Sequence, residues 1–142
     1  MHLSLFWQDI WQSFERVAMA YVLTASIGWE SEREAHSAGV RTFPIVGVAS
    51  CGYILLLGNQ PDIGAQSRLL QGLITGIGFI GGGAILKEGQ TVKGTATAAS
   101  VWNAGVIGAA VAMNRYGIAV TLALLNLFTL RALLPIKRRL DR

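Results

Sequence analysis

A glycine-rich run from Leu69 to Leu86, LLQGLITGIGFIGGGAIL, contains three glycines whose spacing could serve phosphate binding. Gly76, Gly78 and Gly81 form a GxGxxG pattern, which lets the backbone approach a pyrophosphate in dinucleotide-binding folds. In a membrane helix the same residues would let a second helix pack closely. About 20 residues after the pattern the sequence reads TAASVWNAG, which lacks the acidic residue that binds a ribose. This context favours a membrane helix over a nucleotide site.

The sequence contains no recognisable motif of residues that could catalyse a reaction or bind a metal ion. Ser100 has no histidine near it in the sequence, and His36 falls in an expected loop, so a hydrolytic triad is not indicated. The interiors of the apolar segments hold no Asp or Glu, the oxygen ligands that Mg²⁺ would need. We therefore expect no catalytic residue, no cofactor and no metal site.

The composition indicates a membrane protein. Hydrophobic residues make up 52% of the chain, charged residues only 14%, and the mean hydropathy is +0.47. Soluble domains carry about 25% charged residues, and a membrane helix needs about 20 apolar ones. Five apolar segments predict spans at approximately 13–30, 42–59, 69–86, 95–113 and 116–134. We predict an all-α polytopic membrane helix bundle that forms a single transmembrane domain over residues 1–142.

The basic residues predict the orientation of these helices. With five spans and a cytoplasmic C-terminus, nine of the 12 lysines and arginines fall inside, which places the N-terminus outside. They sit at helix ends rather than along one face, so no nucleic-acid partner is indicated. The Arg131 side chain and the tail are expected to reach anionic lipid headgroups. The inside set is Arg33, Arg41, Lys87, Lys93, Arg131, Lys137, Arg138, Arg139 and Arg142, and the outside set is Arg16, Arg68 and Arg115.

Small residues four apart predict close packing between the third and fourth segments. In a membrane such residues let two helix backbones touch, and the short turn from Lys87 to Gly94 favours an antiparallel hairpin. The same faces predict a homo-oligomer. An alternative is that the consecutive glycines break the helix and expose backbone groups to an ion. The predicted packing glycines are Gly72, Gly76, Gly78, Gly82, Gly105 and Gly108.

Two asparagines lie within predicted spans. Asn103 and Asn126 carry amides that are costly to leave unpaired in hydrocarbon, so each is expected to hydrogen-bond across helices. Such a bond could be a structural clasp worth about 1 kcal/mol. Alternatively, the amides could line a small polar cavity together with Trp102 and Thr97.

Two ordered blocks resemble the MgtC/SapB family. The first is GWESEREAHSAGVRTFPIVGVAS, with its Gly-x-Glu-x-Glu and Ala-Gly-x-Arg-Thr signatures. The second is GIGFIGGGAILKEGQTVKGTATAASVWNAGVIGAA, and together the blocks cover roughly residues 20 to 115. The resemblance implies a five-helix, multi-pass protein of the bacterial inner membrane. It further implies a short, SapB-like form without the soluble C-terminal domain of longer members.

Within the matched blocks, a few polar residues are candidates for function or structure. Glu30 or Glu32 could form an ion pair with Arg41 that ties the first loop to the bundle, and the alternative is a solvated helix end. Lys87 and Lys93 belong to the basic, glycine-containing turn of the second block, and Ser100 belongs to its Thr-x-Ala-Ala-Ser-x-Trp motif.

Family members are linked to growth under magnesium limitation and to virulence. The resemblance therefore implies a non-enzymatic protein that regulates or binds another membrane component. The alternative is a transporter of a small cation such as Mg²⁺, or of another small solute. A membrane-bound enzyme is a third class without a supporting motif.

Overall fold

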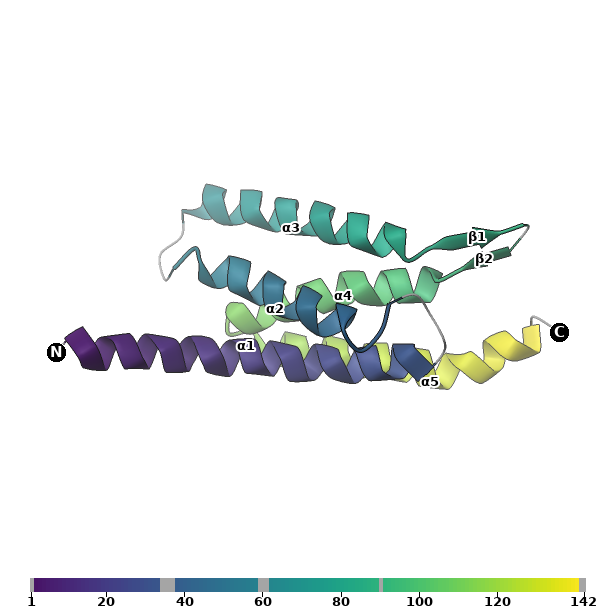
Figure 1. Cartoon of the computed structure of the whole chain (residues 1–142), viewed down its shortest axis with the longest axis horizontal. Coiled ribbons are helices and arrows are strands. Elements are labelled where there is room, and N and C mark those ends of the chain that lie inside the picture. Colours follow the sequence, from purple (N-terminus) through teal and green to yellow (C-terminus); the bar gives the residue numbers. More distant parts are fainter. Residues whose placement is uncertain (1, 34–37, 59–61, 90, 141–142) are drawn as a thin grey trace.

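The residues that the structure describes form five helices and one short β-hairpin (Figure 1). The computed structural model describes residues 2–33, 38–58, 62–89 and 91–140, with only the backbone placed for residues 2 and 136–140. The predicted all-α class and the five helices are confirmed. The helices are α1 (His2–Arg33), α2 (Thr42–Leu55), α3 (Ile63–Gly83), α4 (Thr95–Ala112) and α5 (Tyr116–Leu140), and the strands are β1 (Leu86–Glu88) and β2 (Thr91–Lys93).

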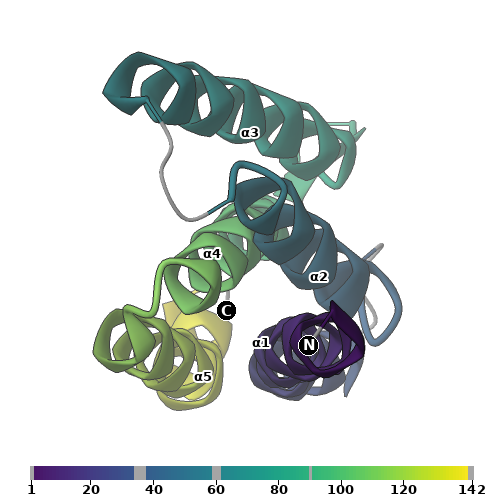
Figure 2. The same cartoon turned by 90° about the vertical axis from the view of Figure 1, so that its left-hand side faces the viewer.

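Helix α4 lies at the centre of the bundle. It packs most extensively against α2 and also contacts α1, α3 and α5 (Figure 2). Its sequence is rich in alanine and glycine, so its backbone can approach its neighbours closely. The largest buried side chains include Val101, Ile107 and Val111 of α4, together with Ile27 of α1 and Phe43 of α2. The core is therefore built around this one helix.

The glycine-rich helix α3 lies at the edge of the bundle (Figure 2). It contacts α4, which confirms the predicted neighbours, but it makes few contacts with α2. Among the described residues of α3, only Ile77 and Gly81 are buried. Most of this helix therefore faces away from its own chain.

Helices α1, α2 and α4 approach one another through small residues. A Cβ atom added to Gly108 of α4 would collide with the backbone oxygen of Gly47 in α2. A Cβ atom on Gly47 would in turn lie 2.6 Å from the Thr24 methyl of α1. The Thr24 hydroxyl donates to the Ala20 oxygen of its own helix at 2.6 Å. These contacts explain why three helices fit so closely together.

The turn between the third and fourth segments is a β-hairpin rather than a plain loop. Strands β1 and β2 pair antiparallel, with Leu86 opposite Lys93. The prediction that the third helix continues to Leu86 is wrong, because three consecutive glycines weaken the helix and it ends at Gly83. Gly94 has a φ of 84°, a left-handed conformation that suits glycine between β2 and α4.

Two of the described helices are both long and apolar enough to cross a membrane. They are Thr95–Ala112, with a mean hydropathy of 1.2, and Tyr116–Pro135, with a mean hydropathy of 1.9. Helix α2 is apolar but has only 14 residues, shorter than the predicted segment 42–59. Helices α1 and α3 begin well before the predicted segments 13–30 and 69–86. The other three predicted spans remain predictions.

Candidate functional site

A polar cluster joins α4 to α5 inside the bundle. The Ser100 hydroxyl donates to Asn126 Oδ1 at 2.9 Å, and both residues are buried. One turn along α4, Asn103 Nδ2 donates to the backbone oxygen of Leu122 at 3.3 Å. The cross-helix hydrogen bonds expected of both asparagines are therefore present. We call Ser100, Asn103 and Asn126 the polar cluster.

A pocket of about 290 Å³ opens beside the polar cluster. All three residues of the cluster line it, and Leu125 and Thr129 of α5 form part of its wall. The predicted cavity wall of Trp102 and Thr97 is wrong. The side chain of Trp102 is 47% exposed elsewhere on α4, and Thr97 is buried away from this pocket. The helical repeat places these two residues on other faces of α4.

An ion pair connects α1 to α5 near the polar cluster. Glu30 Oε2 lies 2.8 Å from Arg131 Nη2. The Glu30 side chain is only 12% exposed and that of Arg131 is 62% exposed. Glu30 Oε2 itself is buried without an aligned hydrogen bond, so the contact is an ion pair with a bent geometry. Arg131, expected only to reach lipid headgroups, instead has a carboxylate partner within the protein.

The predicted pairing of Glu30 or Glu32 with Arg41 is wrong for the described residues. Glu30 pairs with Arg131, and Glu32 Oε2 accepts a hydrogen bond from the Val40 backbone at 3.0 Å. The hydrogen bond between Val40 and Glu32 holds the backbone just before α2 against the end of α1. Arg41 is exposed at the position before α2. The first loop is therefore attached through a backbone amide rather than through an arginine.

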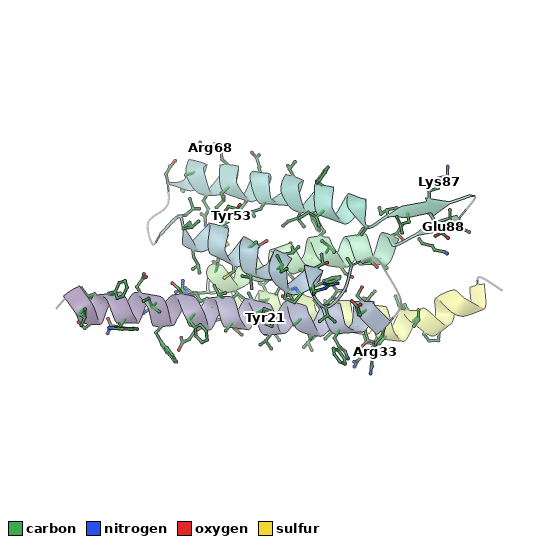
Figure 3. The ribbon with its side chains drawn as sticks, viewed as in Figure 1. Tyr21, Arg33, Tyr53, Arg68, Lys87 and Glu88 are labelled. Atoms are coloured by element: carbon green, nitrogen blue, oxygen red, sulfur yellow. The ribbon has the colours of Figure 1, made fainter. Side chains whose placement is uncertain are left out.

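The basic residues of the hairpin are exposed and do not line the pocket beside the polar cluster. Lys93 Nζ contacts Glu88 Oε2 at 2.7 Å, and both side chains are exposed. This contact lowers the pKa of the Glu88 carboxyl below its usual value, chiefly through the hydrogen bond from Lys93. Lys87 projects from β1 at the same end of the molecule as Arg33, whereas Arg68 lies at the other end (Figure 3). The assignment of these basic groups to opposite sides of a membrane stays a prediction.

The predicted packing glycines have two different environments. Nothing in the described chain lies within 4 Å of a Cβ atom placed on Gly72, Gly76, Gly78 or Gly82. The prediction that these four join α3 to α4 within one chain is wrong, because none of them approaches α4. The glycine of α3 that does approach α4 is Gly81, whose added Cβ atom would lie 3.0 Å from the Ala98 oxygen.

The two predicted glycines of α4 do lie in close contacts. Gly105 meets the end of the Ile77 side chain of α3, and Gly108 meets Gly47 of α2. Sequence reasoning missed the role of Gly47. In the sequence, Gly47 is seen only as a small residue within the apolar run FPIVGVASCG. That position does not identify the helix that Gly47 contacts.

Metal ligands do not gather in the described part of the chain. No group of three or more His, Cys, Asp or Glu side chains there could hold a metal ion. His36 lies outside the described residues, and the side chains of Lys137, Arg138 and Arg139 are not described. The chemistry that the described site offers is neutral hydrogen bonding beside one ion pair.

Removing the Ser100 hydroxyl should destabilise the contact between α4 and α5. Ser100→Ala leaves Asn126 Oδ1 without its donor, and hydrogen bonds between membrane helices average about 0.6 kcal/mol with a maximum near 1.7. We expect a loss of about 1 kcal/mol in the free energy of unfolding, measured by denaturant titration in detergent. Ser26→Ala is the matched control, since Ser26 is exposed and bonds only to its own helix. Equal effects of the two substitutions would contradict this role for Ser100.

The chain is similar in sequence to proteins of one family. The MgtC family model matches residues 17–139. The chain is 33% identical over 109 residues to Protein MgtC of Salmonella typhimurium, covering 75% of this chain and 46% of that protein. It is 30% identical over 102 residues to Protein MgtC of Brucella abortus, covering 72% and 43%. It is 29% identical over 126 residues to "Putative magnesium transporter YhiD" of Escherichia coli K12, covering 80% and 59%.

These alignments cover only part of the other proteins. The chain spans about half the length of the curated relatives it matches. No solved structure matches it.

Proposed function

This chain belongs to the MgtC family, and on that premise we propose that it binds and regulates another component of the bacterial inner membrane. Members of the family are membrane proteins. We propose that all five helices cross the membrane, with the N-terminus outside, and that the protein has no enzymatic activity. We further propose a role in adaptation to magnesium limitation; the name of the Escherichia coli relative, which mentions magnesium, supports a connection with this ion.

The main support for this proposal is that one face of α3 is not covered by the described chain. Gly72 and Gly76 meet no part of the described chain, and they line a groove of about 370 Å³ between α2 and α3. The groove walls are largely apolar and include Leu73 and Ile77 of α3. Tyr53 of α2 and Arg68 of α3 lie near one end of it (Figure 3).

Such a face suits a transmembrane helix of another protein. In lipid, helices associate by close packing, and glycines let a second backbone approach. A side chain of the second helix could enter the groove beside Gly76. The next turn of α3 presents Phe79, whose side chain is 86% exposed. Together these features support a helix-binding surface, which we call the α3 face: Gly72, Gly76, Phe79 and the groove beside them.

Crosslinking from the α3 face tests the proposal. A photoreactive amino acid at position 79 should capture a discrete membrane protein in cells grown with little magnesium. Position 128 is the matched control, because Phe128 of α5 is also a phenylalanine and is 64% exposed. The captured protein should be identified by mass spectrometry. Adducts that are identical at both positions, or no adduct at position 79, would contradict the proposal.

A second substitution makes the result specific to the groove. Gly76→Leu should abolish the adduct at position 79, because the leucine side chain would occupy the groove and exclude the second helix. The substitution should not disturb the fold, because no atom of the described chain lies within 4 Å of a Cβ atom placed on Gly76. The fold should be retained, as checked by circular dichroism. An adduct made only of two copies of this chain would show self-association and would contradict binding of a different protein.

Transport of Mg²⁺ or another small solute is the second candidate function. The observation that favours it is the polar cluster, whose three uncharged side chains line a pocket between α4 and α5. Neutral oxygens can contact a cation that keeps several of its waters. Purified protein in liposomes should then carry Mg²⁺, and Asn126→Leu should abolish the flux. Flux that is absent, or unchanged by this substitution, would contradict transport through the polar cluster.

A further inference from the structure

Helix α1 is longer than a membrane span requires. Its 32 residues correspond to about 48 Å, whereas the hydrocarbon core of a bilayer is about 30 Å thick. The N-terminal part projects past the ends of α2 and α4 (Figure 1). Its side chains from Leu3 to Gln12 are exposed within the described chain. This projecting segment therefore needs surroundings that its own chain does not supply.

The projecting segment carries a continuous apolar stripe. Large apolar side chains recur at intervals of three and four residues, which places them on one face of the helix. Each of them is between 42% and 73% exposed. The other face carries Ser4, Gln8, Asp9 and Gln12, with Leu5 as its one large apolar side chain among residues 3–12. We call the apolar face the aromatic stripe; it consists of Leu3, Phe6, Trp7, Ile10, Trp11 and Phe14.

The aromatic stripe continues along the outward face of α1. Tyr21 and Val22, two helical turns after Phe14, are 53% and 64% exposed, and Trp29 follows two turns later with 57% exposed. If α1 crosses the membrane as proposed above, these outward side chains contact lipid. The stripe is then the extension of a lipid-facing surface beyond the bundle.

We propose that the aromatic stripe inserts into the interfacial layer of the membrane, where lipid headgroups meet acyl chains. Tryptophan is enriched at this layer, and an amphipathic helix with one apolar face can lie in it. Residues 2–13 contain Asp9 but no Lys or Arg, so insertion of rings rather than charge attraction supplies the binding.

The position of Arg16 agrees with this assignment. Arg16 follows the stripe and donates to the Ala112 oxygen at the end of α4, at 3.5 Å. It lines a polar pocket together with Arg115, which lies at the turn between α4 and α5. Charged groups at the ends of membrane helices mark the boundary with water. The aromatic stripe ends at Phe14, two residues before Arg16, and therefore adjoins that boundary.

Tryptophan fluorescence in lipid vesicles tests the proposal. The variant Trp29→Phe/Trp102→Phe retains only Trp7 and Trp11, both in the aromatic stripe. Its emission should be blue-shifted and should be quenched more strongly by lipids brominated near the headgroup than by lipids brominated near the chain end. Aqueous iodide should quench it weakly. Strong iodide quenching without lipid quenching would overturn the proposal, and so would protection from both quenchers.

A reciprocal variant separates this proposal from the membrane location on which it rests. Trp7→Phe/Trp11→Phe retains Trp29 and Trp102, and Trp102 is 47% exposed on α4. If α4 crosses the membrane, brominated lipids should quench this variant. Quenching here without quenching of the stripe would overturn the interfacial assignment alone. Failure of both variants would overturn the membrane location itself.

Discussion

Replacing Gly108 by alanine is expected to lower the unfolding temperature of the purified protein in detergent. The added methyl group would collide with the backbone oxygen of Gly47, which cannot rotate away as a side chain could. Helices α2 and α4 would have to separate, and they form the most extensive helix contact in the bundle. Overpacking of a closely packed core costs about 1–3 kcal/mol.

The same substitution elsewhere supplies matched controls. Gly82→Ala meets open space in the described chain, and alanine favours a helix over glycine by about 1 kcal/mol, so its unfolding temperature should be unchanged or higher. Gly105→Ala should be intermediate, because it meets the flexible end of Ile77. Equal unfolding temperatures for the Gly108 and Gly82 variants would show that α2 and α4 do not touch in this way.

The helices could be predicted from the sequence because the hydropathy of a segment depends only on the residues of that segment. The segment 95–113 matches α4 closely, since its long apolar run has the same form whatever surrounds it. The hydrogen bonding of Asn103 and Asn126 was also predictable. An amide within an apolar segment requires a partner wherever the helix packs.

The partners of the small residues could not be predicted in the same way. A row of glycines indicates that another helix can approach closely, but it does not indicate which of the neighbouring helices does so. The row in α3 is the more conspicuous one, yet α4 uses Gly108 to meet Gly47, a glycine outside any such row. Choice among neighbours depends on the packing of the whole bundle.

The partner of Glu30 shows the same limit. Arg41 follows it in the next predicted segment and was the nearer choice along the chain, whereas Arg131 lies in the last helix. The structure brings α1 and α5 together, which no local pattern indicates. In the resulting ion pair the Glu30 side chain is 12% exposed and the Arg131 side chain is 62% exposed, and this difference leads to a directional prediction.

Removal of Arg131 is expected to destabilise the protein more than removal of the charge on Glu30. In Arg131→Gln the Glu30 carboxylate keeps its buried Oε2 but loses the guanidinium in contact with it, and only the more distant charge of Arg33 remains. In Glu30→Gln the remaining Arg131 is 62% exposed and can reach water or lipid headgroups. We expect Arg131→Gln to lower the free energy of unfolding by more than Glu30→Gln does, but by less than the breaking of a fully buried pair, because one member is exposed.

Unfolding titrations of both single variants and of the double variant measure this asymmetry. The double variant should be no less stable than Arg131→Gln, because the buried charge has then been removed. Arg68→Gln is the matched control, since Arg68 and Asp62 are 3.9 Å apart with both side chains about three-quarters exposed. Such exposed pairs contribute about 0–1 kcal/mol. If Arg131→Gln and Arg68→Gln lose the same stability, the Glu30 carboxylate is solvated in the folded protein, and the contact between α1 and α5 does not depend on the ion pair.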